Sequence, residues 1–334
     1  MSDVRTFDLL TPHVVLDAVE AAFDVRLDGT LTAYPSYVNR VYEVRDDDGN
    51  AYITKFYRPG RWTPEAVIDE HRFVNDCAAA DVPVVAPIAD GRGATIFSAA
   101  VDEDDGAETY LFALYPKRGG RNFDAEGEED WVRLGRLVGR AHAVAAGRTA
   151  RHRLVCTPNE STRTFIEELR RSEVVHPDHR DDFFDGAEGA ARLVAPLFDD
   201  VPLSRIHGDC HRGNILDRPG EGLLLIDFDD MMIGPAVHDL WLLLPDRAYA
   251  CRRELELLIG GYEEFFPFDR ATLRLIEPLR LMRMIYYLAW SARQREDHRF
   301  RESFPDWGNE AFWIKEIEDV RTQLAVIQED LRDV

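Results

Sequence analysis

Short hydrophobic runs alternate with polar, turn-forming residues along the first third of the chain. The alternation predicts strands at residues 27–34, 40–46 and 51–57, with a hairpin turn of sequence D-D-D-G-N between the last two. Thr63, Pro64 and Glu65 form the signature of a helix start, so we expect a helix to continue to about Ala80. Further strand-like runs follow at residues 86–89, 94–99 and 109–115.

This order of elements predicts a small antiparallel sheet covered by one helix. The sequence P-K-R-G-G-R at 116–121 breaks the pattern, so we expect an N-terminal lobe over 1–116 and a C-terminal lobe over 117–334. Hydrophobic periodicity in the second part predicts helices at residues 128–147, 161–171, 186–198, 247–266, 270–295 and 309–332. A helix-poor interval, 205–239, contains two short apolar runs joined by the turn D-R-P-G. The predicted class is α+β, with the bilobal layout of protein-kinase-like folds.

Composition limits the partners and the compartment. The 334 residues carry a formal net charge of −22, which argues against a nucleic-acid partner because phosphate contacts require a basic surface. Two explanations of the acidic surface remain open: steering of basic substrates, or adaptation to a salty cytoplasm and solubility. The acids are spread along the whole chain, which favours the second. No apolar run reaches the roughly 18 residues of a membrane span, and the four cysteines form no C-x-x-C pair. We therefore expect a cytoplasmic protein with reduced thiols, no membrane partner and a monomeric state.

Two runs carry the chemistry: H-G-D-C-H-R-G-N at 207–214 and I-D-F-D-D at 226–230. Phosphoryl transfer to a hydroxyl requires an acid to orient and deprotonate the acceptor and oxygen ligands to hold Mg²⁺ on the phosphates. Asp209 suits the first role. Asn214, five residues later, and Asp227, after the second apolar run, supply the oxygen ligands that Mg²⁺ prefers. The other interpretation, a capped loop followed by a solvated acidic turn, does not explain why both runs occur at this spacing. We predict Asp209 and Asp227 as catalytic residues and Asn214 and Asp227 as metal ligands.

Several further runs resemble a known family. They are S-Y-V-N-R-V-Y at 36–42, K-F-Y-R-P-G-R-W at 55–62, G-P-A-V-H-D-L-W at 234–241, E-P-L-R at 277–280 and Y-Y-L-A-W at 286–290. Together with the H-G-D-x-x-x-x-N loop they resemble the aminoglycoside phosphotransferase/choline kinase-like enzymes. Within this group the sequence is most similar to the stress response kinase A family of bacterial Ser/Thr protein kinases. The resemblance covers most of the chain.

The resemblance implies roles for residues outside the two catalytic runs. Ser36 would contact the nucleotide, and Lys55, one of three lysines in the chain, would grip its phosphates. Glu70 on the first predicted helix would pair with Lys55, since Glu65 lies in the first turn and is less suited. Asp239 and His207 would support the catalytic loop without taking part in the reaction.

The sequence departs from the usual kinase pattern at two points. Residues 34–39, Y-P-S-Y-V-N, contain no glycine where kinases place a G-x-G-x-x-G loop over the phosphates. The run D-F-D lacks the glycine of D-F-G, so a flipping activation segment is not supported. Asp229 and Asp230 are either supporting acids or an additional metal ligand.

The sequence therefore predicts an ATP- and Mg²⁺-dependent phosphotransferase. The resemblance implies a Ser/Thr protein kinase of the stress response that is able to autophosphorylate. A small-molecule kinase acting on an amino alcohol, sugar or aminoglycoside is the alternative, because the same fold serves those acceptors. A pseudokinase-like binding module is disfavoured, because Lys55, Asp209, Asn214 and Asp227 are all present.

Overall fold

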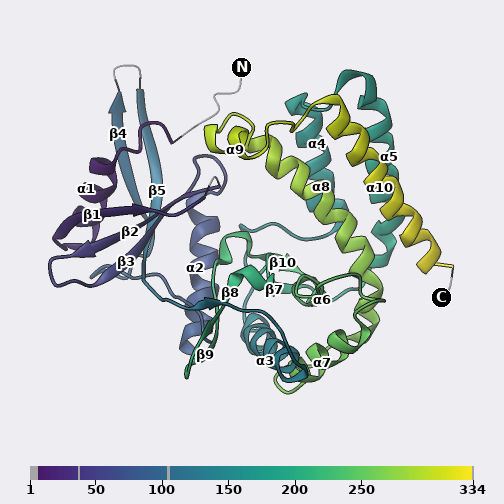
Figure 1. The fold of residues 1–334 in the computed structure, drawn as a ribbon, viewed down its shortest axis with the longest axis horizontal. Coiled ribbons are helices and arrows are strands. Elements are labelled where there is room, and N and C mark those ends of the chain that lie inside the picture. Colours follow the sequence, from purple (N-terminus) through teal and green to yellow (C-terminus); the bar gives the residue numbers. More distant parts are fainter. Residues whose placement is uncertain (1–6, 37, 104–105, 333–334) are drawn as a thin grey trace. The chain divides into compact units, whose positions relative to one another are not determined.

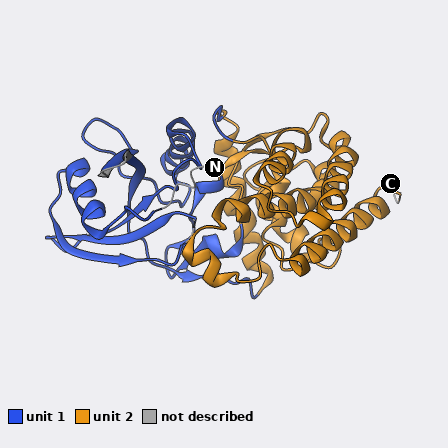
Figure 2. Ribbon diagram, turned by 90° about the horizontal axis from the view of Figure 1, so that it is seen from above, with its two compact units in different colours: residues 1–126, 150–153, 211–230 blue, residues 127–149, 154–210, 231–334 orange. Residues whose placement is uncertain are grey.

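The fold is described from a computed structural model, which covers residues 7–36, 38–103 and 106–332 (Figure 1). Tyr37, which belongs to the glycine-free loop, lies outside the described residues. The chain divides into two compact units (Figure 2). The first comprises residues 1–126, 150–153 and 211–230, and the second comprises 127–149, 154–210 and 231–334. The first unit thus extends past the predicted boundary at 116/117 and takes in two later segments of the chain.

The first unit contains a five-stranded antiparallel sheet in its described part, in the order β1-β2-β3-β5-β4. Its strands are β1 (Leu27–Ala33), β2 (Arg40–Asp46), β3 (Ala51–Phe56), β4 (Phe97–Glu103) and β5 (Gly106–Pro116). The predicted turn between β2 and β3 forms as expected: Asp46 accepts a hydrogen bond from the backbone of Asn50 at 2.8 Å, and Gly49 adopts φ of 81°. Residues 86–89, predicted as a strand, are described but lie outside the strands of this sheet.

Two helices accompany this sheet. Helix α2 (Pro64–Ala79) starts where the sequence predicted, with the Thr63 hydroxyl accepting from the backbone of Ala66 at 3.3 Å. Helix α1 (Pro12–Phe23) has the same Thr-Pro start at Thr11 but was not predicted. It contributes Val15 and Val19 to a hydrophobic core shared with residues of the sheet.

A small second sheet in the first unit carries the predicted hairpin. Its strands are β6 (Arg121–Asn122), β8 (Ile215–Arg218) and β9 (Gly222–Leu225), in the order β6-β8-β9. Gly220 and Gly222 adopt φ of 82° and 97°, which side chains other than glycine rarely tolerate, and so permit the tight turn. The hairpin aligns the residues on either side of it, because the backbone of Ile226 donates to the carbonyl of Asn214 at 3.0 Å.

The second unit is mainly helical, as predicted, and the α+β class is confirmed. Its helices are α3 (Glu128–Ala145), α4 (Arg163–Ser172), α5 (Arg180–Val194), α6 (Val237–Trp241), α7 (Arg252–Glu263), α8 (Ile276–Gln294), α9 (His298–Ser303) and α10 (Glu310–Asp330). A short two-stranded sheet pairs β7 (Ser204–Ile206) with β10 (Met232–Gly234). Helices α3 and α7 approach closely at Gly135, where a Cβ atom would lie 2.0 Å from the carbonyl of Leu258. Among the described residues, no helix is both long and apolar enough to cross a membrane.

Several helix boundaries differ from the prediction for local reasons. Helix α5 begins at Arg180 instead of residue 186, and Gly186 and Gly189 lie within it. Residues 270–275 form a 3₁₀ helix capped by the Asp269 side chain, and α8 proper starts at Ile276. These shifts of a turn or two leave the predicted architecture unchanged.

Candidate active site

A mainly apolar pocket of about 230 Å³ lies within the first unit. It is lined by Val41, Ile53, Lys55, Glu70, Val74, Val85, Tyr115, Pro116, Arg118, Leu216, Ile226, Asp227 and Phe228. Three predicted site residues, Lys55, Glu70 and Asp227, are therefore brought together in one pocket. Apolar walls with a few convergent charged groups are typical of a site for a small ligand.

Lys55 lies in the middle of β3, opposite Val41 of β2 and Ala113 of β5. Its side chain is 13% exposed, and its Nζ lies 2.7 Å from Oδ1 of Asp227. Burial lowers the pKa of Lys55, but the carboxylates of Asp227 and Asp229 outweigh it and raise the pKa well above the ordinary value. The lysine therefore stays charged in its pocket.

Glu70, on α2, is 2% exposed and is the second charged group of the pocket. Within the described part of the chain, its Oε2 has no hydrogen-bond partner, and the guanidinium of Arg153 lies 3.7 Å away. Burial raises the pKa of Glu70 to about 7, although Lys55 opposes this rise. Among the described residues, Lys55 makes its ion pair with Asp227, so the predicted pairing of Lys55 with Glu70 is not formed in this structure. A carboxyl whose pKa is raised to about 7 is partly protonated near neutral pH and attracts an ammonium less strongly than a fully ionised one.

Asp227 and Asn214, the predicted metal ligands, both belong to the first unit. Asn214 ends a short 3₁₀ helix and is 9% exposed, whereas the Asp227 side chain is 50% exposed. The hydrogen bond from Ile226 to the Asn214 carbonyl places the two residues on adjacent backbone segments. An amide and a carboxylate oxygen suit a hard divalent cation such as Mg²⁺, so the donor set fits the predicted metal. Asp227 also adopts φ of 63°, a left-handed backbone conformation that aspartate tolerates better than most residues other than glycine.

Asp209, the predicted base, belongs to the second unit, since the chain passes between the units after Cys210. Its Oδ1 accepts an ion-paired hydrogen bond from Arg283 of α8 at 2.5 Å, and its side chain is 24% exposed. Its backbone N–H donates to the ring of His207 at 3.3 Å. The sequence analysis did not identify Arg283, although it follows the E-P-L-R run by three residues.

Asp239 holds the catalytic loop from within the second unit, as predicted. Its carboxylate accepts hydrogen bonds from the backbone N–H groups of His207 at 2.7 Å and Gly208 at 2.9 Å. His142 also bonds to it, with Nε2 at 3.0 Å. Burial raises the pKa of Asp239, but the hydrogen bond from His142 and the nearby histidines hold it below the ordinary value. Gly208 takes φ of 81°, which explains a glycine before the predicted base.

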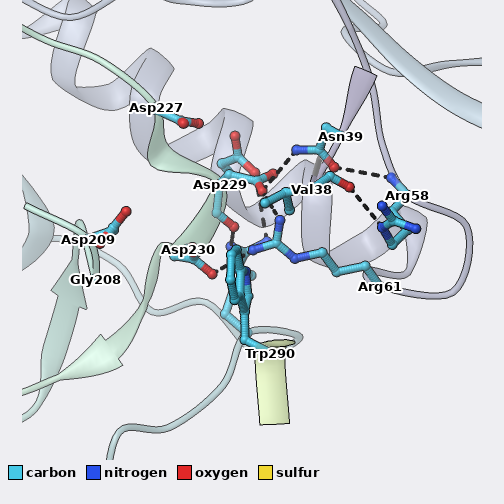
Figure 3. Close-up of polar contacts among 12 residues, drawn as sticks. Val38, Asn39, Arg58, Arg61, Gly208, Asp209, Asp227, Asp229, Asp230 and Trp290 are labelled. Carbon is cyan, nitrogen blue, oxygen red and sulfur yellow. Dashed lines mark hydrogen bonds and ion pairs between the residues drawn. The ribbon is translucent and has the colours of Figure 1, made fainter. Parts of the chain in front are cut away.

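The two acids after Asp227 are held by Arg61. Its guanidinium pairs with Asp229 and with Asp230, the latter at 2.7 Å, in the first unit (Figure 3). Of the two roles considered, the ion pair favours supporting acids over an additional metal ligand, because a guanidinium competes with a cation for the same oxygens. Arg61 belongs to the K-F-Y-R-P-G-R-W run, which was the available sequence signal for this contact.

Ser36 lies in the glycine-free loop between β1 and β2 and is half-buried. Its carbonyl oxygen accepts a hydrogen bond from Arg40 at 3.1 Å. The loop ends at Asn39, which is buried. The predicted nucleotide contact of Ser36 therefore stays a prediction.

Comparison with known proteins identifies relatives that are named as phosphotransferases or kinases. A sequence model of the phosphotransferase enzyme family matches residues 30–276. The chain is 37% identical to stress response kinase A of Escherichia coli (strain K12), covering 97% of this chain and 95% of that protein. It is 34% identical, over the same shares, to the serine/threonine protein kinase RdoA of Salmonella typhimurium (strain LT2).

Solved structures are similar in fold. Amicoumacin kinase hAmiN, solved in complex with AMP-PNP, Ca²⁺ and Ami, superposes with a TM-score of 0.72 at 18% identity, covering 93% of each chain. A microcompartment-associated aminopropanol kinase gives 0.67 at 18% identity, covering 97% of this chain and 98% of that one. At these identities the likeness establishes the fold and leaves the acceptor open.

Proposed function

Because the chain belongs to the phosphotransferase enzyme family, we propose that it is a serine/threonine protein kinase of the stress response kinase A type, transferring the γ-phosphate of ATP to protein hydroxyls. The observation that carries the choice of acceptor is the 34% identity, over 97% of the chain, to a relative named serine/threonine protein kinase. The small-molecule kinases that resemble the chain only in fold are 18% identical, which is too distant to decide the acceptor.

The pocket in the first unit supports ATP as the phosphate donor. Its apolar walls suit a planar base, and Lys55 at one side supplies a fixed positive charge for phosphate oxygens. Ser36 and the backbone around it would contact the nucleotide from the loop before β2. Glu70 would accept the Lys55 ammonium when Asp227 is engaged elsewhere.

Asn214 and Asp227 would hold Mg²⁺ through their side-chain oxygens. In that position Mg²⁺ would supply positive charge that offsets the negative charge of the phosphates. Asp227 is half exposed, so its carboxylate is accessible from solvent. In that state the ammonium of Lys55 would pair with a phosphate or with Glu70 in place of Asp227.

Asp209 would act on the acceptor hydroxyl. Its carboxylate takes the hydroxyl proton as the serine or threonine oxygen bonds to the γ-phosphorus and the bond to the β–γ bridging oxygen breaks, releasing ADP. Arg283 fixes the orientation of this carboxylate, and Asp239 fixes the backbone of the loop that carries it. We also propose that the protein works in the cytoplasm as a monomer, with its four buried cysteines reduced.

The test is incubation of the protein with γ-labelled ATP and Mg²⁺, alone and with a generic basic protein, beside Asp209→Ala. The exposed Asp199, in the same unit, provides the matched control Asp199→Ala. We expect label on protein for the unmodified enzyme and the control, and at least a thousandfold less for Asp209→Ala, because an acid that acts in the transition state contributes mainly to kcat. Full activity of Asp209→Ala would refute the mechanism. ATP binding that depends on Mg²⁺ without protein labelling would instead favour a small hydroxylated acceptor.

A further inference from the structure

The glycine-free loop between β1 and β2 is anchored by the buried side chain of Asn39, which is 4% exposed. Its Oδ1 accepts from the backbone N–H of Arg58 at 3.1 Å, and its Nδ2 donates to Oδ2 of Asp229 at 3.0 Å (Figure 3). One amide therefore links the loop to the chain just after β3 and to the segment that carries Asp227. Both amide groups are used, so the side chain has one preferred orientation.

Two arginines after β3 hold the same loop and segment. The Nε of Arg58 donates to the carbonyl of Val38 at 3.0 Å, which fixes the last backbone turn of the loop. Arg61, whose side chain is 5% exposed, pairs with Asp229 and Asp230. In Figure 3, Asn39 from the loop and Arg61 from the segment after β3 both reach Asp229, whereas Arg58 contacts Val38 and Asn39.

Asp229 is the centre of these contacts and is buried, at 5% exposure. Burial raises its pKa, but Arg61, Lys55 and Arg153 more than offset this and hold it below the ordinary value. Arg153 also donates to the backbone carbonyl of Asp229 and to that of Ala66 in α2, the latter at 3.3 Å. The ionised carboxylate thus sits at a junction of the loop, α2 and the segment after Asp227, all within the first unit.

We propose that Asn39, Arg61 and Asp229 form a lock that positions the described backbone of this loop, at Ser36, Val38 and Asn39, for the phosphates of the nucleotide, in place of a glycine-rich loop. This inference rests on the proposed function. A glycine-rich loop approaches phosphates because it lacks side chains, but it is free to move. Here Asn39 of the loop is hydrogen-bonded to Asp229, two positions from Asp227. The positions of the loop and of the predicted metal ligand are therefore fixed relative to each other. Such preorganisation lowers the entropic cost of ordering a loop on its ligand.

A merely structural role makes a different prediction. If the lock only stabilised the fold, its loss would lower the melting temperature and weaken every ligand equally, or none. A positioning role weakens ligands that carry phosphates and spares those that do not. Adenosine and ATP, which share the base and ribose, separate the two cases.

The experiment measures binding of ATP with Mg²⁺ and of adenosine by calorimetry, together with the KM for ATP and kcat. The variants are Asn39→Ala and Asn39→Asp. Asn39→Asp places two carboxylates face to face, because the side chain at position 39 faces Asp229. Asn50→Ala is the matched control, because Asn50 also donates its amide to a carboxylate, Asp46 at 2.8 Å, but at the far end of β2.

We expect Asn39→Ala to weaken ATP binding and raise its KM roughly tenfold, the usual effect of losing a hydrogen bond to a charged group, with adenosine affinity and kcat changed less than about twofold. Asn39→Asp should be weaker still, and Asn50→Ala should match the unmodified protein. Unchanged ATP affinity in Asn39→Ala, or equal losses for ATP and adenosine, would overturn the lock. An unmodified protein that binds neither ligand would overturn the proposed function itself.

Discussion

Replacing Glu70 by glutamine should stabilise the protein at neutral and alkaline pH. Burial raises the pKa of this carboxyl from the ordinary 4.5 to about 7, with Lys55 and Arg153 opposing the rise and Asp229 and Asp227 adding to it. Between these two values the folded protein keeps the Glu70 proton, whereas the unfolded chain has lost it. The folded state then binds more protons, so its stability falls as the pH rises through this window.

The size of the effect follows from the same two values. At about 1.4 kcal/mol for each pKa unit, the wild-type protein loses on the order of 3 kcal/mol of unfolding free energy between about pH 4.5 and pH 7. Glutamine has no proton to lose, so Glu70→Gln escapes this loss. Its stability relative to wild type should grow across the window and level off above about pH 7.

The assay is urea unfolding of both proteins followed by circular dichroism at several pH values from about pH 4 to pH 8. The difference between the two proteins is the informative quantity, because it removes the opposing contribution of His71. Burial lowers the pKa of His71 to about 3, so that group makes stability fall as the pH drops below about 6.5. Glu65→Gln, an exposed position on the same helix, is the matched control and should show no such gain. A difference that stays flat or shrinks between pH 5 and pH 8 would refute the reasoning.

Three further substitutions test other parts of the site. Lys55→Ala should raise the KM for ATP tenfold or more, because a buried charge for the phosphates is lost, and an unchanged KM in an ATP titration would count against this role. Asp227→Asn should increase the Mg²⁺ concentration for half-maximal activity at least tenfold, since an amide is a weaker ligand than a carboxylate; an unaltered Mg²⁺ titration would exclude Asp227 as a ligand. Asp239→Asn should lower the unfolding free energy by about 2 kcal/mol and reduce kcat, because the hydrogen bonds to His207 and Gly208 lose their charge; thermal unfolding at native levels would contradict this.

Local signals were sufficient to predict most of the first unit. Strands β1, β2 and β3 lie within a residue of their predicted ends, and α2 starts at the predicted N-cap, Thr63. Turn chemistry and helix caps act over a few residues, so the sequence displays them directly. Helix α1 was not predicted, although Thr11 and Pro12 carry the same start signal as α2. The strand predicted at 86–89 does not form: the backbone N–H of Ile88 donates to Leu114 of β5, but the segment is not among the strands of the described sheets.

Three residues predicted for the site lie in one pocket, but the predicted pairing of Lys55 with Glu70 does not form. The catalytic runs and the lone strand lysine identified Lys55 and Asp227, and the structure brings them together. Spacing could not show that Lys55 would bind Asp227 instead of Glu70, because that choice depends on how the strand, the helix and the hairpin pack in the folded unit. The contact of Asn39 with Asp229 joins positions 190 residues apart, and its partners are known only once the chain has folded.

The missing glycine in D-F-D gains a physical explanation from these contacts. A flip of this segment would remove Phe228 from the core, where its ring meets that of Phe73 edge-on at 5.6 Å. It would also separate Asp229 from Arg61, and both side chains are about 5% exposed. Separating a buried ion pair costs on the order of 3–5 kcal/mol, because each charge is left without its partner. Glycine would offer no such anchor, so aspartate at this position makes the segment after Asp227 a fixed part of the first unit, and we expect control of activity to act elsewhere in the chain.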